Sequence, residues 1–141
     1  MSIDDLEFVK LKFAHLLPRH LIEDVKGRTF SPEQFYAYQE AQIKSGNENN
    51  LLYALIDAEK KIQGYLWAEI SNLDNTMFVN TFSISKEYWH KGKAIANIVA
   101  FLEGLKAKHN CPRVFWITTN EKFFLKHGFK RSKNVLMEYA S

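Results

Sequence analysis

The 141-residue chain has only one cysteine, Cys111, so no disulfide can form within it. We interpret Cys111 as a reduced structural thiol of a cytoplasmic protein, with a catalytic thiol as the alternative. No apolar run approaches transmembrane length, and two aspartates lie where a signal peptide needs basic and then apolar residues. These absences predict a soluble, intracellular protein with no membrane partner.

Positive charge is neither abundant nor concentrated in this chain. Its formal net charge is +3, and its lysines are scattered from Lys10 to Lys133 without a dense basic run. An anionic small ligand is therefore a simpler partner than nucleic acid, which we do not expect to bind. Trp67, Trp89 and Trp116 are interpreted as core and rim aromatics, because no basic stripe interleaves with them.

Metal binding and a second domain are also disfavoured. The five histidines lack the spacing of a metal site and have no cysteine pair nearby: His15, His20, His90, His109 and His127. With 46% hydrophobic residues, the chain can fill one core, and it is too short for two ordinary domains. No repeat or linker interrupts it, so residues 1–141 are expected to form a single domain.

Hydrophobic periodicity predicts an α/β (α+β) domain. A helix is expected over residues 32–45, because Ser31, Pro32 and Gln34 form an N-terminal capping pattern and Gly46 follows its end. The other expected helices cover residues 19–25, 93–108 and 121–126, and the expected strands cover 6–12, 51–57, 62–70, 76–85, 113–118 and 129–139. The strands over 51–85 are predicted to form an antiparallel meander.

The segment from Thr81 to Ile95 joins an alternating strand to a basic turn that opens the helix over 93–108. A helix N-terminus presents unpaired backbone N–H groups and partial positive charge, which suits a diphosphate. Gly92 would let the ligand approach the backbone, and the flanking cations are His90, Lys91 and Lys93. The alternative is an ordinary turn with solvated lysines.

A second motif follows at Trp116–Phe129, where Asn120 and two threonines precede Phe-Phe and a closing Gly128-Phe129. Together with the turn, in this order, it resembles the GNAT superfamily of N-acetyltransferases over about residues 51–139. The family turn reads Gln or Arg, two variable residues, Gly, one variable residue, then Gly or Ala. Gly92 and Ala94 match it, whereas Trp89 replaces the Gln or Arg.

The resemblance implies a mixed, mostly antiparallel sheet flanked by helices, with two parallel strands that splay near Ile84 and Thr118. It implies acetyl-coenzyme A as cofactor, with pantetheine lying between those strands as a pseudo-strand and a backbone N–H near Ile84 polarising the thioester carbonyl. The residues expected to contact the cofactor are Phe82, Ser83, Ile84, Trp89, His90, Lys91, Gly92, Lys93, Ala94, Asn120 and Phe124.

The acceptor implied by the resemblance is a primary amine on a small molecule, peptide or protein, and it would lie against the early helices. Tyr36, Tyr38 and Gln39 are candidates to touch it, with ordinary helix packing as the alternative. Glu69 is the candidate general base, because alternation places it on the same strand face as Tyr65 and Trp67. The alternative for Glu69 is a solvated carboxylate near a strand end.

One catalytic position departs from the family pattern. Many members place a Tyr on the short C-terminal helix to hydrogen-bond the leaving thiolate, but this chain has Phe124 there. The thiol can still leave, because its pKa near ~8.5 lets water protonate it. The leading prediction is an N-acetyltransferase, either monomer or homodimer, and the alternative is a GNAT-fold coenzyme A-binding or protein-interaction module without turnover.

Overall fold

The computed structural model describes residues 6–25, 29–88, 93–118, 121–126, 128–133 and 137–139. Along these ranges the helices and strands follow the expected order up to the last helix. The elements are β1 (Glu7–Lys10), a 3-10 turn (Ala14–Leu16), α1 (Arg19–Glu23), α2 (Pro32–Ser45), β2 (Asn50–Ile56), β3 (Ile62–Ile70), β4 (Met77–Ile84), a second 3-10 turn (Lys86–Tyr88), α3 (Lys93–Lys108), β5 (Val114–Trp116) and α4 (Glu121–Lys126).

The five strands form one mixed sheet in the order β1-β2-β3-β4-β5. The first three neighbouring pairs are antiparallel, and β4 pairs with β5 in parallel. A parallel neighbour requires a crossover, and α3 supplies it between β4 and β5. The predicted meander and the predicted parallel pair are both confirmed.

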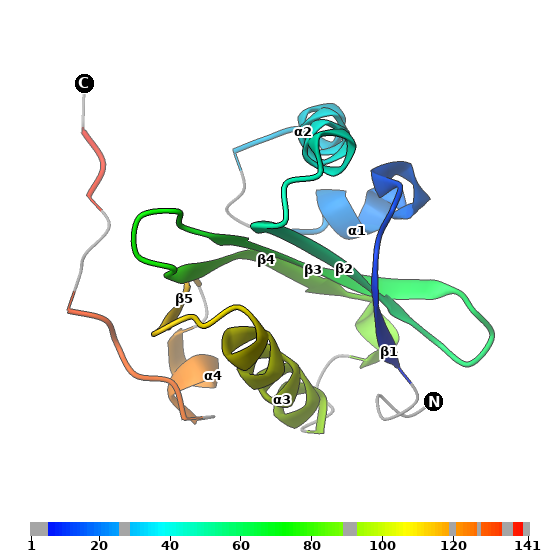
Figure 1. The fold of residues 1–141 in the computed structure, drawn as a ribbon. Coiled ribbons are helices and arrows are strands. Elements are labelled where there is room, and N and C mark those ends of the chain that lie inside the picture. Colours follow the sequence, from blue (N-terminus) through cyan, green and yellow to red (C-terminus); the bar gives the residue numbers. More distant parts are fainter. Residues whose placement is uncertain are drawn as a thin grey trace.

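Helices cover both faces of the sheet. Figure 1 shows α1 and α2 on one face and α3 with α4 on the other. Alternation along β2 separates two cores: Leu51 and Tyr53 pack on the α3 side, whereas Leu52 and Ala54 pack on the side of α1 and α2. Within the described ranges, no helix is both long and apolar enough to cross a membrane.

Helix α2 has the predicted ends. The Ser31 side chain accepts a hydrogen bond from the Gln34 backbone N–H, and the Gln34 side chain accepts one from the Ser31 N–H, which completes a capping box. At the other end Gly46 adopts a left-handed conformation with φ of 69°, which a residue with a Cβ adopts only at a cost. The sequence pattern therefore fixes where α2 begins and ends.

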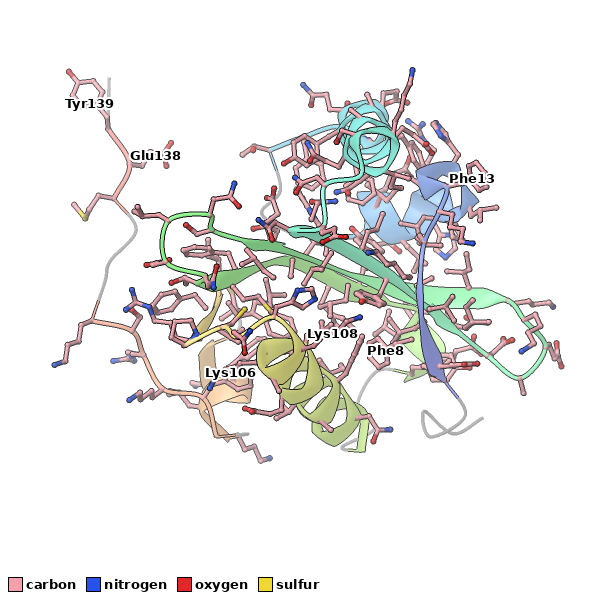
Figure 2. The ribbon with its side chains drawn as sticks, viewed as in Figure 1. Phe8, Phe13, Lys106, Lys108, Glu138 and Tyr139 are labelled. Carbon is pink, nitrogen blue, oxygen red and sulfur yellow. The ribbon has the colours of Figure 1, made fainter. Side chains whose placement is uncertain are left out.

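The predicted last strand over residues 129–139 is wrong for the residues that the structure describes. Residues 129–133 and 137–139 form no strand, and Met137 and Tyr139 are 82% and 92% exposed. Figure 2 shows Glu138 and Tyr139 well away from the sheet. The first half of this segment carries Lys130, Arg131 and Lys133, which leaves little apolar surface to bury against a neighbouring strand.

Candidate functional site

Strand β4 is paired with β5 over only part of its length, whereas all of the shorter β5 is paired. Their pairs run from Met77 opposite Val114 to Val79 opposite Trp116, and β4 then continues to Ile84. The pairing thus stops before the level of Ile84 and Thr118, where we expected the strands to separate. Strand β5 is also shorter and less buried than the strand predicted over 113–118. Among the described residues, the strand pairing of β4 beyond Val79 is with β3.

A β-bulge lies at the point where this pairing ends. Ala68 pairs with Val79 and Trp67 pairs with Thr81, so Asn80 has no partner in the register between β3 and β4. Because paired residues share a face of the sheet, the extra residue directs both Asn80 and Thr81 toward α2. The bulge therefore adds one polar side chain to the α2 side of the sheet beside the end of β5.

That side chain and a tyrosine from α2 hold Glu69. Asn80 Nδ2 donates to Glu69 Oε1 across 2.6 Å, and the Tyr38 hydroxyl donates to Glu69 Oε2 across 2.5 Å. The hydrogen bond to Glu69, aided by partial burial, raises the pKa of Tyr38 to about 12. Glu69 is half-buried and positioned by neighbours from two elements, so a simply solvated carboxylate at a strand end does not describe it.

Of the three α2 residues considered for the acceptor, only Tyr38 reaches this site. The Tyr36 hydroxyl donates to the backbone carbonyl of Leu17, and Gln39 is fully buried, where its Oε1 accepts a hydrogen bond from Asn50. Tyr36 and Gln39 therefore serve helix packing, as the alternative interpretation held. Tyr38 is 40% exposed and lies beside Trp67, with a ring separation of 5.6 Å.

The three candidate cofactor residues on β4 lie at the end of the strand beyond its pairing with β5. Phe82 packs against the α3 core and its ring lies 6.0 Å from that of Trp116. Ser83 is buried and faces α2, because it pairs with Tyr65, which belongs to the core on the side of α1 and α2. Ile84 pairs with Gly64 of β3, so this end of β4 is fixed on its β3 side.

Gly64 determines how closely β3 approaches that segment. A Cβ added at Gly64 would lie 2.5 Å from the Ser83 carbonyl oxygen and 3.2 Å from the Ile84 Cα, both of which are backbone atoms. Only glycine permits this approach without a shift of β4. Gly64 and Asn80 are not among the candidate site residues chosen from the sequence, although a glycine inside a strand pattern is a usable signal of close backbone contact.

Phe124 belongs to an aromatic cluster beneath the end of β5. Its ring lies 4.8 Å from Trp116 and 5.0 Å from Phe129, and the latter pair meets edge to face. Together with Phe82, these rings line the side of the site nearest α4. The cluster brings Phe82 together with Phe124 and Phe129, which lie more than forty positions later in the sequence. Phe124 belongs to the Phe-Phe pair of the second motif, and Phe129 belongs to its Gly-Phe pair.

The expected phosphate turn is described only in part. Trp89, His90, Lys91, Gly92 and Asn120 lie outside the described residues. Helix α3 starts at Lys93, as predicted, and the backbone of Lys93 and Ala94 forms its first turn. Their assignment to the cofactor site stays a prediction.

The single thiol is structural. Cys111 is buried in the core between the sheet and α3, and burial raises its pKa above the ordinary value. A raised pKa leaves less thiolate at neutral pH, which disfavours nucleophilic catalysis. The first interpretation of Cys111 is therefore confirmed in its structural part.

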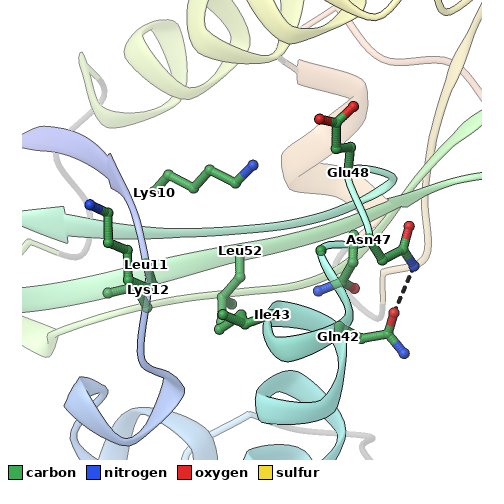
Figure 3. A pocket seen from close by; sticks show the side chains of 10 residues that line it. Lys10, Leu11, Lys12, Gln42, Ile43, Asn47, Glu48 and Leu52 are labelled. Carbon is green, nitrogen blue, oxygen red and sulfur yellow. Dashed lines mark hydrogen bonds between the residues drawn. The ribbon is translucent and has the colours of Figure 1, made fainter.

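A separate pocket of about 390 Å³ lies at the C-terminal end of α2 (Figure 3). It is formed by β1, the end of α2 and the start of β2, and the side chains around its mouth include Lys10, Lys12, Gln42 and Glu48. None of the residues selected from the sequence lines this pocket. The candidate site residues lie instead around the end of β4 and its neighbours.

No family model matches the chain, and no curated protein sequence matches it. Solved structures do. The chain has 14% identity and a TM-score of 0.75 to the aminoglycoside N-acetyltransferase AAC(6')-Iy in complex with CoA, with 96% of this chain and 94% of that one covered. A possible acetyltransferase from Clostridium difficile 630 matches with 12% identity and a TM-score of 0.72, covering 96% and 97%.

Glucosamine-6-phosphate N-acetyltransferase from Arabidopsis thaliana also matches, with 16% identity, a TM-score of 0.65 and coverage of 96% and 99%. Identities this low carry information on the fold and not on the substrate. The matches extend over nearly the whole chain and agree with a mixed sheet of antiparallel and parallel pairs flanked by helices. This chain therefore has the fold of the GNAT N-acetyltransferases.

Proposed function

We propose that the protein transfers an acetyl group from acetyl-coenzyme A to a primary amine. The observation that carries the proposal is the end of the β4–β5 pairing at Val79 and Trp116, next to a bulge and with β4 continuing to Ile84. A polypeptide-like arm made of amides can bind such a strand segment as a neighbouring strand would. Pantetheine has this chemistry, and solved structures of AAC(6')-Iy are complexes with CoA and with a CoA-based bisubstrate analogue.

In this proposal the residues of β4 bind and orient the acyl donor. Phe82, Ser83 and Ile84 contact its arm, and a backbone N–H near Ile84 donates to the carbonyl oxygen as it gains charge. The glycine turn before α3 binds the diphosphate through backbone N–H groups and helix polarity. The bound thioester supplies an already activated acyl group, so positioning of the amine is the main contribution of the protein.

The acceptor amine must lose a proton before or during attack. Glu69 is the candidate base, and its two existing hydrogen bonds leave lone pairs for one more donor, because an ionised carboxylate has about four acceptor positions. Tyr38 and Asn80 then act as positioning residues that fix the carboxylate. The alternative is that the protein uses the fraction of amine that arrives uncharged, with Glu69 only orienting it.

The proposal is tested first by binding and then by turnover. Thermal unfolding and calorimetric titration with coenzyme A and acetyl-coenzyme A should show a rise in Tm and saturable binding. A thiol-release assay over a panel of primary amines should then show acceptor-dependent turnover. Absence of coenzyme A binding by both methods would overturn the proposal.

The second candidate is a GNAT-fold module that binds coenzyme A or a protein without turnover. Two residues favour it: Trp89 stands where the family turn has Gln or Arg, and Phe124 stands where many members have Tyr. Phe124 packs against Trp116 and Phe129, so a structural role explains its identity. Tight binding of acetyl-coenzyme A without thiol release for any amine would favour this candidate.

A further inference from the structure

Four residues form a continuous row across the sheet at the level of Glu69. The strand register places Asn50 opposite Glu69 and Glu69 opposite Phe78, and Phe78 is the parallel partner of Phe115. Val114 and Trp116 pack on the α3 core, so alternation turns Phe115 to the α2 side, where its ring lies 5.7 Å from Phe78. The row thus ends in two neighbouring aromatic rings.

The aromatic end of the row is accessible. Phe78 is 39% exposed although it lies in the middle of the sheet, in a strand whose other face is buried against α3. Tyr38, which is similarly exposed, borders the row from α2 and contacts the carboxylate of Glu69. Directly opposite residues on paired strands are near enough for their side chains to contact one ligand together. A carboxylate and an exposed aromatic ring are therefore combined on one surface.

Glu69 supplies negative charge to this surface. Both side chains that donate to Glu69 are neutral, and no ion pair to it is found within the described ranges. Arg113 lies at the far end of the row, with its guanidinium 5.2 Å from the centre of the Phe115 ring and 3.4 Å from Asp74. Asp74 partly offsets the charge of Arg113, and no cationic side chain of the described residues forms an ion pair with Glu69.

We propose that this row is the acceptor subsite and that it selects a cationic primary amine carried by an apolar or aromatic body. The inference rests on the proposed acetyl transfer and specifies its acceptor. Glu69 binds the ammonium, while Phe78 and Phe115 bind the body of the acceptor next to it. The row lies one residue before the last β4–β5 pair, so an amine held by Glu69 is close to where the strands cease to pair.

The same surface disfavours polyhydroxylated amines. Hydroxyl groups placed over Phe78 and Phe115 lose hydrogen bonds to water and gain no partner from the rings. An aromatic acceptor, in contrast, gains from removing apolar area from water and from ring contacts. Discrimination of this kind is expressed as a difference in kcat/KM between acceptors.

The experiment compares acceptors by thiol release at saturating acetyl-coenzyme A. The probes are 2-phenylethylamine, ethanolamine and a tetrapeptide with an N-terminal phenylalanine, which separates a small-molecule source of the amine from a peptide source. We expect kcat/KM to be at least about tenfold higher for one aromatic probe than for ethanolamine. Equal values for all three would overturn the inference while leaving acetyl transfer itself in place.

Two variants test the role of the ring. Phe78→Ala should raise KM for the preferred aromatic probe by about tenfold and leave that for ethanolamine within about twofold. Leu73→Ala is the matched control, because Leu73 is 93% exposed in the turn before β4 and lies outside the row. An equal effect of Phe78→Ala on both amines would contradict the inference.

A direct binding measurement keeps the test decisive if no amine supports turnover. Titration of 2-phenylethylamine and of the tetrapeptide into the 141-residue protein, followed by NMR, should give saturable shifts that weaken in Phe78→Ala and in Glu69→Gln. Turnover absent with this binding present would overturn acetyl transfer alone. Absence of binding of both aromatic probes, with or without turnover of other amines, would overturn the acceptor assignment.

Discussion

The Tyr38 hydroxyl donates to Glu69 Oε2 across 2.5 Å and so joins α2 to β3 at the edge of the candidate site. The partners are 31 positions apart in the sequence, on elements with different periodicities. The contact links the position of Glu69, the carboxylate proposed to bind the acceptor amine, to the packing of α2. A substitution at Tyr38 should therefore alter the surroundings of Glu69, and a substitution at Glu69 should alter the ionisation of Tyr38.

Tyr38 should ionise about two pH units above an ordinary tyrosine. Its pKa of about 12 exceeds the ordinary value of 10.0 because the hydrogen bond to Glu69 and partial burial both favour the phenol. The difference in ultraviolet absorbance between wild type and Tyr38→Phe across an alkaline titration isolates this group. In Glu69→Gln the transition should move toward pH 10. An unchanged transition would show that Glu69 does not set it.

The raised pKa of Tyr38 also determines in which direction the stability of the fold changes with pH. A folded-state pKa above the unfolded value stabilises the fold fully below pH 10, and that contribution is lost as pH rises through about 12. Wild type should therefore lose more stability than Tyr38→Phe between those values, and the two should have parallel profiles from pH 7 to pH 10. Urea unfolding at each pH measures the difference.

Glu69→Gln tests the base. If Glu69 accepts the proton of the amine, the substitution should remove the acidic limb of the pH profile and lower the rate on the order of 10²-fold. The amide keeps the size of the side chain but cannot accept a proton. Near-normal rates from about pH 6 to about pH 9 would mean that the amine arrives uncharged. The measurement uses saturating acceptor, so that an effect on KM is not counted as an effect on kcat.

Gly64→Ala should displace the cofactor segment of β4. The new Cβ would lie 2.5 Å from the Ser83 carbonyl oxygen, so the backbone at Ser83 and Ile84 must move. We expect a loss of about 1–3 kcal/mol in unfolding free energy, as for overpacked cores, and weaker coenzyme A binding. Calorimetric titration and urea unfolding measure the two effects.

Gly104→Ala is the matched control for that substitution. Gly104 lies inside α3 and an added Cβ meets no atom within 4 Å. Alanine should stabilise the helix by up to about 1 kcal/mol and leave coenzyme A affinity unchanged. Similar losses of affinity in both glycine variants would contradict the close approach at Gly64.

Gly92→Glu tests the phosphate turn. A bulky anionic side chain at the start of α3 should obstruct the backbone cradle and repel the diphosphate, so coenzyme A binding should weaken while the fold persists. Circular dichroism checks the fold, and titration calorimetry measures the affinity. Unchanged affinity in the folded variant would place the diphosphate elsewhere.

Phe124→Tyr tests the missing acid. If water protonates the leaving thiolate, activity should stay similar or rise modestly, and the alkaline limb should reflect the amine and thiol. The kcat profile of wild type and variant over pH 7–10 gives the comparison. A large gain in kcat, with a new limb from a phenol, would show that the missing hydroxyl limits the wild-type rate.

Local sequence signals predict where a helix begins and ends better than they predict which other elements it contacts. The capping residues Ser31 and Gln34 and the αL glycine Gly46 act within a few residues, so the bounds of α2 could be predicted from the sequence alone. The apolar repeat of α3 likewise determined a helix over Lys93–Lys108. In such segments the information that selects the structure is contained in the segment itself.

Contacts between residues that are far apart in the sequence are harder to predict from it. Alternation placed Glu69 on the right face, but it could not show that Tyr38 and not Tyr36 would reach it, since that depends on the rotation of α2 over the sheet. The bulge at Asn80 has no glycine or proline to indicate it. The segment over 129–139 is predicted to be a strand, although its basic first half gives a partner strand little to bury.

The bulge at Asn80 makes the length of β4 adjustable by one residue. Val79 and Phe82 face α3, while Thr81 and Ser83 face α2 together with their partners Trp67 and Tyr65. Removing the extra residue would restore regular alternation without turning any of these side chains around. Insertion or deletion at this position could therefore alter the chemistry beside Glu69 in a lineage that keeps both cores intact.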